Sequence, residues 1–221
     1  MTGVPAAIRG RRSAGHGTRR RSRMRRRHKI FIAAAVCLSL AATGAYSYSY
    51  FMWYPRRFGA VVPGSIYRSG QPTASQLGRL VREKGIRAVV RFRTSRSLAS
   101  DPKVREETQF ATQSGLKLFD LAFEDRPPEE SVRKLLEILD DETNHPVLLH
   151  CARGVVRTGA AVAVYRMERE GWGPEEALSE MLSCGFARRI YAGSKSLGVL
   201  VFVASYRPTH PAPPGKGEAA R

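Results

Sequence analysis

Hydrophobic positions divide this chain of 221 residues into one long uncharged stretch and a series of shorter elements. Residues 30–54 carry no charged side chain, and as a helix they would extend about 37 Å, enough to cross a bilayer. From residue 61 onwards, short apolar runs alternate with segments of helical periodicity. This pattern predicts an α/β domain over residues 61–206, with a central sheet flanked by helices on both faces.

The element limits follow from the apolar runs and from the residues that begin and end helices. Thr73 is a favoured N-cap residue, and Gly85 and Gly115 stand where a helix is expected to stop. The expected strands are 65–69, 86–92, 116–123 and 146–150. The expected helices are 73–84, 101–114, 127–141, 158–170, 174–182 and 194–205.

Both ends of the chain have compositions typical of disorder. Residues 1–29 hold ten arginines, one lysine and no acid, and residues 207–221 are rich in proline and glycine. The arm contributes +11 of the formal net charge of +18. Because most of the charge lies outside the domain, we expect no nucleic-acid binding. The moderately basic domain suits an anionic substrate.

The uncharged stretch is aliphatic first and aromatic afterwards, as at a membrane interface. Its aromatic end contains Tyr46, Tyr48, Tyr50, Trp53 and Tyr54. A signal peptide cleaved near residues 43–45 and a buried core helix are the two alternatives. The Arg-rich arm and the aromatic belt favour a retained, single-pass anchor.

The cysteines indicate neither disulfides nor zinc. The chain has three cysteines, Cys37, Cys151 and Cys184, which is an odd count. They form no CxxC pair or Cys/His cluster, and the five histidines are scattered. We therefore expect no metal. Cys184 is either a buried structural thiol or a resolving partner for Cys151.

One stretch, HCARGVVRTG at residues 150–159, carries the candidate chemistry. An apolar strand runs directly into Cys151, and a helix is expected just after Arg157. Backbone N–H groups between a strand end and a helix N-terminus converge on one point, which makes an anion site. Gly154 allows the backbone to turn there.

The residue types fit phosphoryl transfer. A thiol beside an arginine at a helix N-terminus has a lowered pKa, so Cys151 is the candidate nucleophile. Arg157 offers a planar fork to phosphate oxygens. Thr158 can hydrogen-bond the sulfur, and we expect His150 to brace the loop. The expected substrate-binding residues are Ala152, Arg153, Gly154, Val155, Val156 and Thr158.

These residues carry a family resemblance. HCARGVVRTG resembles the HCxxGxxR[ST]G signature of cysteine-dependent protein tyrosine and dual-specificity phosphatases. FEDRPP at residues 123–128 is similar to the general-acid loop of phosphatase-and-tensin-type enzymes, which implies Asp125 as the acid; Asp120 and Glu124 are the alternatives. VVPGSIYRSGQP, IRAVVRF and GWGPEEALSEM resemble segments of bacterial and plant atypical dual-specificity phosphatases. The resemblance covers about residues 61–206.

The resemblance implies a phosphoric monoester hydrolase with a phosphocysteine intermediate and no cofactor. Val155 and Val156 stand where phosphoinositide 3-phosphatases carry Lys and Gly, which argues against specificity for inositol lipids. The sequence also shows no aromatic loop of the kind that gives classical tyrosine phosphatases a deep phosphotyrosine slot, so we expect a shallow pocket of broad specificity. Phosphotyrosine, inositol phosphates, phospholipids and sugar phosphates all stay open as substrates. The rival functions are a catalytically weak phosphate-binding module, a sulfurtransferase and a membrane-docked basic structural protein. Arg68, in the YRSGQP motif, either reaches the active site or has a structural role.

The charge distribution around the hydrophobic segment predicts its orientation. Eleven basic side chains precede it, and only Arg56 and Arg57 follow it closely. The positive-inside rule then places the Arg-rich end in the cytoplasm and the catalytic domain outside, in the periplasm of a bacterium.

Overall fold

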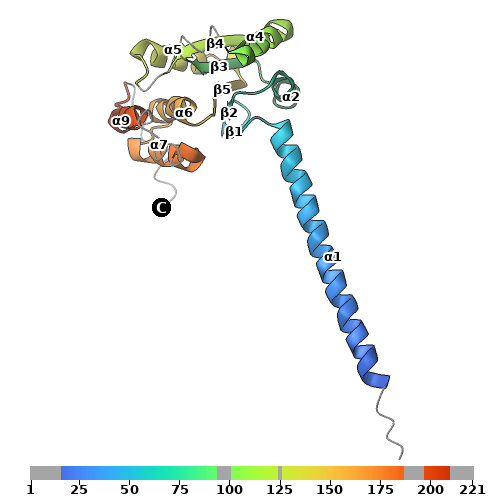
Figure 1. The fold of residues 1–221 in the computed structure, drawn as a ribbon. Coiled ribbons are helices and arrows are strands. Elements are labelled where there is room, and N and C mark those ends of the chain that lie inside the picture. Colours follow the sequence, from blue (N-terminus) through green and yellow to red (C-terminus); the bar gives the residue numbers. More distant parts are fainter. Residues whose placement is uncertain (1–15, 94–100, 124–125, 187–196, 210–221) are drawn as a thin grey trace, which may run out of the picture. The chain divides into compact units, whose positions relative to one another are not determined.

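The computed structural model describes residues 16–93, 101–123, 126–186 and 197–209 (Figure 1). The chain divides into two compact units, residues 1–50 and residues 51–221. The first unit consists, within its described part, of helix α1, which spans His16–Trp53 and so continues into the second unit.

Helix α1 contains a segment that is long and apolar enough to cross a membrane, His28–Tyr50. The helix begins at His16, so residues 16–29 are helical, whereas the sequence suggested disorder from residue 1 to residue 29. Arginine is a good helix former, and extending an existing helix avoids the cost of nucleation. Residues 1–15 lie outside the described part.

A five-stranded sheet forms the centre of the second unit, in the order β1-β2-β5-β3-β4. Strand β1 runs antiparallel to β2, and the other neighbours are parallel. The strands are β1 (Gly59–Val62), β2 (Ile66–Gly70), β3 (Ala88–Arg93), β4 (Lys117–Ala122) and β5 (Val147–Cys151). Because β2, β3, β4 and β5 are parallel, their carboxyl ends meet at one edge of the sheet.

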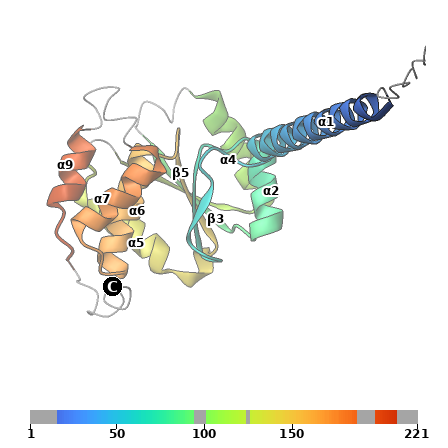
Figure 2. The same ribbon diagram turned by 90° about the horizontal axis from the view of Figure 1, so that it is seen from below.

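Helices cover both faces of this sheet, as Figure 2 shows, and the predicted α/β fold is confirmed. On one side lie α2 (Ala74–Lys84) and α4 (Pro102–Ser114). On the other side lie α5 (Glu129–Asp140), α6 (Val156–Arg169), α7 (Pro174–Met181) and α9 (Leu197–Ser205). The described residues also include a 3-10 turn at Glu142–Asn144 and a π-turn at Leu182–Phe186.

Successive side chains of β3 point to opposite faces of the sheet, so this strand contributes to a hydrophobic core on each face. Ala88, Val90 and Phe92 join the larger hydrophobic core, under the second set of helices. Val89 joins the smaller core under α2. Each valine or phenylalanine side chain buried in this way contributes about 1.5–3 kcal/mol of transfer free energy.

The helix ends follow the predicted signals. The hydroxyl of Thr73 accepts the backbone N–H of Gln76, whose side chain accepts the backbone N–H of Thr73 in return. This capping box satisfies two donors that the first turn of α2 would otherwise leave open. Gly85 and Gly115 both take left-handed conformations at the ends of α2 and α4.

The domain makes contacts beyond the limits expected from the sequence. The Tyr54 hydroxyl donates to Glu83 at 2.6 Å, ahead of residue 61. At the other end, Thr209 donates its backbone N–H to Glu168 Oε1 at 3.0 Å, although residues from 207 were expected to be disordered. Residues 210–221 lie outside the described part, as do the first residues of the helix expected over 194–205.

Candidate active site

Cys151 is the last residue of β5, and α6 begins five residues later at Val156. We call residues 151–157 the phosphate loop. Gly70, the last residue of β2, pairs with Cys151, so the loop starts at the carboxyl edge of the parallel sheet. Helix α6 begins two residues earlier than the sequence suggested, which brings Arg157 into its first turn. The loop therefore joins a strand end to the positive end of a helix.

Gly154 is the residue that lets the loop lie against β2. Its φ is +69°, and a Cβ atom there would come within 2.5 Å of the Gly70 backbone nitrogen. Any side chain would push the loop away from the sheet edge. The glycine is therefore required both for the left-handed turn and for the close backbone approach.

The Cys151 thiol is buried, with 4% of the residue exposed. Burial by itself would raise its pKa, yet the pKa is lowered from 9.0 because four neighbouring groups favour the thiolate. These are the Thr158 hydroxyl, the backbone N–H groups of Thr158 and Arg153, and the charge of Arg157. The buried Thr158 hydroxyl makes no regular hydrogen bond within the described chain, so it is available to the sulfur.

Arg157 is fixed at the end of a neighbouring strand. Its Nη1 atom donates to the carbonyl oxygen of Phe92 on β3 at 2.8 Å, and the side chain is partly buried. This bond uses one of the five N–H donors of the guanidinium. An arginine held in this way has little rotamer freedom left to lose when it binds an oxyanion.

The other predicted binding residues differ in how far their side chains are exposed to solvent. Ala152 and Arg153 are exposed at the loop, whereas Val155 is buried in the larger core and Val156 packs against it. The valine side chains therefore point away from solvent, and their possible contribution to a ligand is the backbone N–H. Arg153 is the loop residue with an exposed charge.

Three N–H groups from the amino-terminal part of the second unit donate hydrogen bonds to backbone carbonyl oxygens of the loop. Two of the three are arginine side chains, and for one of these, Arg57, no contact with the loop was expected from the sequence. The bonds are Gln71 N to Ala152 O at 3.4 Å, Arg57 Nη1 to Arg153 O at 3.2 Å, and Arg68 Nη2 to Gly154 O at 3.1 Å.

A buried polar network lies under α4, on the opposite face of the sheet from the thiol. His150 contacts Glu107, which also faces Arg91 and Arg93. Glu107 was missed in the sequence. The available signal was its place between Val104 and Ala111, where the buried stripe of α4 carries a charge.

Asp120 belongs to the same network. Its two carboxylate oxygens accept Nε and Nη2 of Arg91 at 2.8 and 2.6 Å. Both oxygens of this carboxylate are occupied by Arg91, which argues against Asp120 as the residue that meets a leaving group. Asp125 and Glu124, the other candidate acids, lie outside the described residues.

No metal centre is found in the part of the chain that the structure describes. No group of three or more His, Cys, Asp and Glu side chains there is arranged to hold an ion. Cys184 is a free thiol of intermediate exposure, and Cys151 is likewise free.

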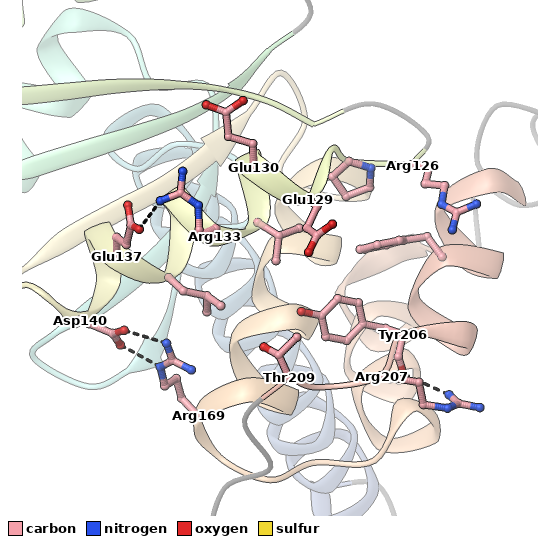
Figure 3. A pocket seen from close by; sticks show the side chains of 14 residues that line it. Arg126, Glu129, Glu130, Arg133, Glu137, Asp140, Arg169, Tyr206, Arg207 and Thr209 are labelled. Carbon is pink, nitrogen blue, oxygen red and sulfur yellow. Dashed lines mark hydrogen bonds and ion pairs between the residues drawn. The ribbon is translucent and has the colours of Figure 1, made fainter.

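A cavity of about 750 Å³ lies away from the phosphate loop, between α5 and the segment from α9 to Thr209 (Figure 3). Its charged walls are largely paired: Arg133 bonds Glu137, and Arg169 bonds Asp140. No residue of the phosphate loop lines it. This hollow therefore gives no account of the cysteine chemistry.

The proteins that this chain resembles are phosphatases, in agreement with the anion-binding geometry of the loop. A protein family described as "DSP-PTPase phosphatase fused to NAD+ Kinase" matches residues 63–194, well over half of the chain. The inositol diphosphatase DSP2 of Oryza sativa subsp. japonica is 36% identical over 118 residues, which are 51% of this chain and 54% of that protein. The dual specificity protein phosphatase TpbA of Pseudomonas aeruginosa is 32% identical over 124 residues, 55% of this chain and 52% of that protein.

The chain thus spans about half the length of the curated relatives it matches. Among solved structures, the core catalytic domain of the PP-IP phosphatase SIW14 from S. cerevisiae, in complex with citrate, is similar with a TM-score of 0.57. The sequences are 24% identical, and the match covers 70% of this chain and 87% of that one. This likeness shows a shared fold.

Proposed function

Because this chain belongs to the family of dual-specificity-type protein tyrosine phosphatase domains matched over residues 63–194, we propose that it hydrolyses phosphoric monoesters through a phosphocysteine intermediate. The observation that carries the proposal is the position of the buried Cys151 thiol, at a strand end that faces a helix N-terminus and beside groups that lower its pKa. A buried thiol has an unfavourable environment for charge, so groups that nonetheless favour the thiolate indicate a nucleophile.

The proposed reaction has two steps. The Cys151 thiolate attacks phosphorus in line, the S–P bond forms, and the P–O bond to the leaving group breaks. Arg157 and the loop N–H groups hold the non-bridging oxygens, whose charge is spread in the transition state. Asp125 donates its proton to the leaving oxygen and then takes one from the water that cleaves the S–P bond. Cysteine is regenerated, inorganic phosphate is released, and no cofactor enters.

Two substrate classes are proposed. One is a phosphorylated protein side chain, since TpbA is named a dual specificity protein phosphatase. The other is an inositol diphosphate, favoured because several curated relatives from rice and Arabidopsis thaliana are named inositol diphosphatases. The exposed charge of Arg153 beside the loop suits either anion.

A phosphate-release screen of the full-length protein in detergent micelles tests the proposal. The substrates are a phosphotyrosine peptide, a diphosphoinositol polyphosphate, a phosphoinositide in mixed micelles and a hexose phosphate. Cys151→Ser is the matched control. Release from at least one substrate by the wild type alone supports the proposal, and no release from any substrate contradicts it.

We also propose that His28–Tyr50 anchors the protein in a membrane as a single span. The segment is a stretch of 23 residues within helix α1, and its carboxyl-terminal end is aromatic. The ten arginines before it favour a cytoplasmic N-terminus, which would put the catalytic domain, proposed over residues 61–206, on the periplasmic side.

A further inference from the structure

Arg68 lies beside the phosphate loop in an unusual electrostatic setting. It is 5% exposed, on β2 opposite Leu149, and its Nη2 atom donates to the Gly154 carbonyl. Its Nε and Nη1 atoms are buried and have no hydrogen-bond partner within the described chain. Among the described residues, none supplies a carboxylate to this guanidinium. A buried charge without a partner is costly.

Other buried or partly buried arginines of the domain are compensated differently. Arg91 is bonded by Asp120, and Arg166 is bonded by Glu170 and Glu180. Arg166 also donates Nη2 to a backbone carbonyl at 3.1 Å, the same type and length of bond that Arg68 makes to the loop. Arg166 therefore has carboxylate partners, and it also lies over the Trp172 ring, whereas no carboxylate from the described residues reaches Arg68. This leaves room for an external anion as the counter-charge of Arg68.

The contact with Gly154 connects Arg68 to the anion-binding side of the loop. The Gly154 carbonyl and the Val155 N–H belong to one planar trans peptide, so they point in opposite directions. An arginine that holds the oxygen therefore aims the N–H away from itself and polarises it. Backbone N–H groups of such a loop are what binds a phosphate.

We propose that Arg68 is a positioning residue of the phosphate loop, which orients the Gly154–Val155 peptide and supplies buried positive charge whose counter-ion is the bound phosphate. The inference rests on the proposed function and adds a residue that does not touch the substrate. It also predicts that a substitution of Arg68 affects anion binding and protein stability in opposite directions. Replacing an uncompensated buried cation by an apolar side chain of similar length removes a desolvation cost, while it weakens anion binding.

The test uses the full-length protein in detergent with three variants: Arg68→Met, Arg68→Lys and the matched control Arg166→Met. Orthovanadate affinity is measured by calorimetry, and the alkylation rate of Cys151 is followed against pH. We expect Arg68→Met to bind vanadate about tenfold more weakly and to shift alkylation to higher pH, because it loses a charged hydrogen bond. Arg68→Lys is expected to keep part of the vanadate affinity and part of the wild-type pH dependence of alkylation. Arg166→Met keeps the wild-type affinity and pH profile but melts at a lower temperature.

Melting temperatures separate positioning from a merely structural role. Arg68→Met is expected to melt no lower than Arg166→Met. Wild-type vanadate affinity in Arg68→Met, or a melting temperature below that of Arg166→Met, would overturn the inference. If the wild type itself fails to bind vanadate and its Cys151 alkylates like a free cysteine, then the proposed function fails, which is a different result.

Discussion

The Oε1 atom of Glu107 and the Nε2 atom of His150 lie 2.6 Å apart, and neither side chain is more than 2% exposed. His150 directly precedes Cys151 on β5, and Glu107 lies on α4, so the contact ties this helix to the strand that ends at Cys151. Glu107 Oε2 also lies 3.8 Å from Arg91 Nη1 and 3.7 Å from Arg93 Nη2. One buried carboxylate thus faces two buried cations.

Glu107→Gln is expected to lower the free energy of unfolding by about 3 kcal/mol, because both arginines lose a buried counter-charge. The matched control is Glu106→Gln, at the exposed neighbouring position of the same helix, which should change stability by less than about 0.5 kcal/mol. Urea unfolding followed by circular dichroism measures both. Equal stability of the two variants would show that the network contributes nothing.

This network marks where prediction from the sequence stops. The capping box of Thr73 and the left-handed Gly85 were predicted because their signals are contained within a few residues. Glu107 and His150 are 43 positions apart, and nothing local in either segment points to the other. Pairings of this kind depend on how the helices and strands pack, which the periodicity of a single segment does not specify.

The candidate active site shows the same division. Cys151, Gly154 and Arg157 could be named from the sequence because strand, loop and helix start follow one another within the signature. The bond from Arg68 to Gly154 joins residues 86 positions apart, so the sequence left two roles open for Arg68. The start of α6 was placed two residues late because Val155 provides no side-chain cap. The preceding loop sets that start.

Cys151→Ser is expected to abolish hydrolysis of an aryl phosphate, because serine at this position lacks an ionised nucleophile at neutral pH. Cys184→Ser should retain most of the activity, since Cys184 lies outside the phosphate loop. Wild-type activity should survive a metal chelator and be inhibited by vanadate. If Cys151→Ser hydrolyses the aryl phosphate as fast as the wild type, Cys151 is not the nucleophile.

The alkylation of Cys151 by iodoacetamide is expected to titrate with a midpoint below 9.0, the ordinary thiol value, because its pKa is lowered in the folded protein. The thiolate therefore adds stability that is complete above pH 9 and is lost as the pH falls through the folded pKa. Thr158→Val removes the hydroxyl that favours the thiolate and should raise the midpoint. An unchanged midpoint in Thr158→Val would assign the shift to the backbone and Arg157.

The general acid can be tested through the leaving group. Asp125→Asn should slow an alkyl phosphate far more than an activated aryl phosphate, because a leaving group with a pKa near 7 needs little protonation. Asp120→Asn is the comparison. Since Asp120 is engaged by Arg91, that change should lower stability without a dependence on the leaving group. A leaving-group effect in Asp120→Asn instead would reverse the assignment.

Membrane topology is tested with reporter fusions, because the basic side chains before and after the hydrophobic segment are so unequal. In a bacterial host, alkaline phosphatase fused after residue 221 should be active, since it requires export, whereas a fusion after residue 28 should be inactive. A fluorescent protein that matures only in the cytoplasm should give the opposite pattern. The periplasm is oxidising, so a thiolate-rich Cys151 would be exposed to oxidation there. If the carboxyl-terminal fusion instead reports the cytoplasm, the charge rule has failed for this chain, and Cys151 works in a reducing compartment.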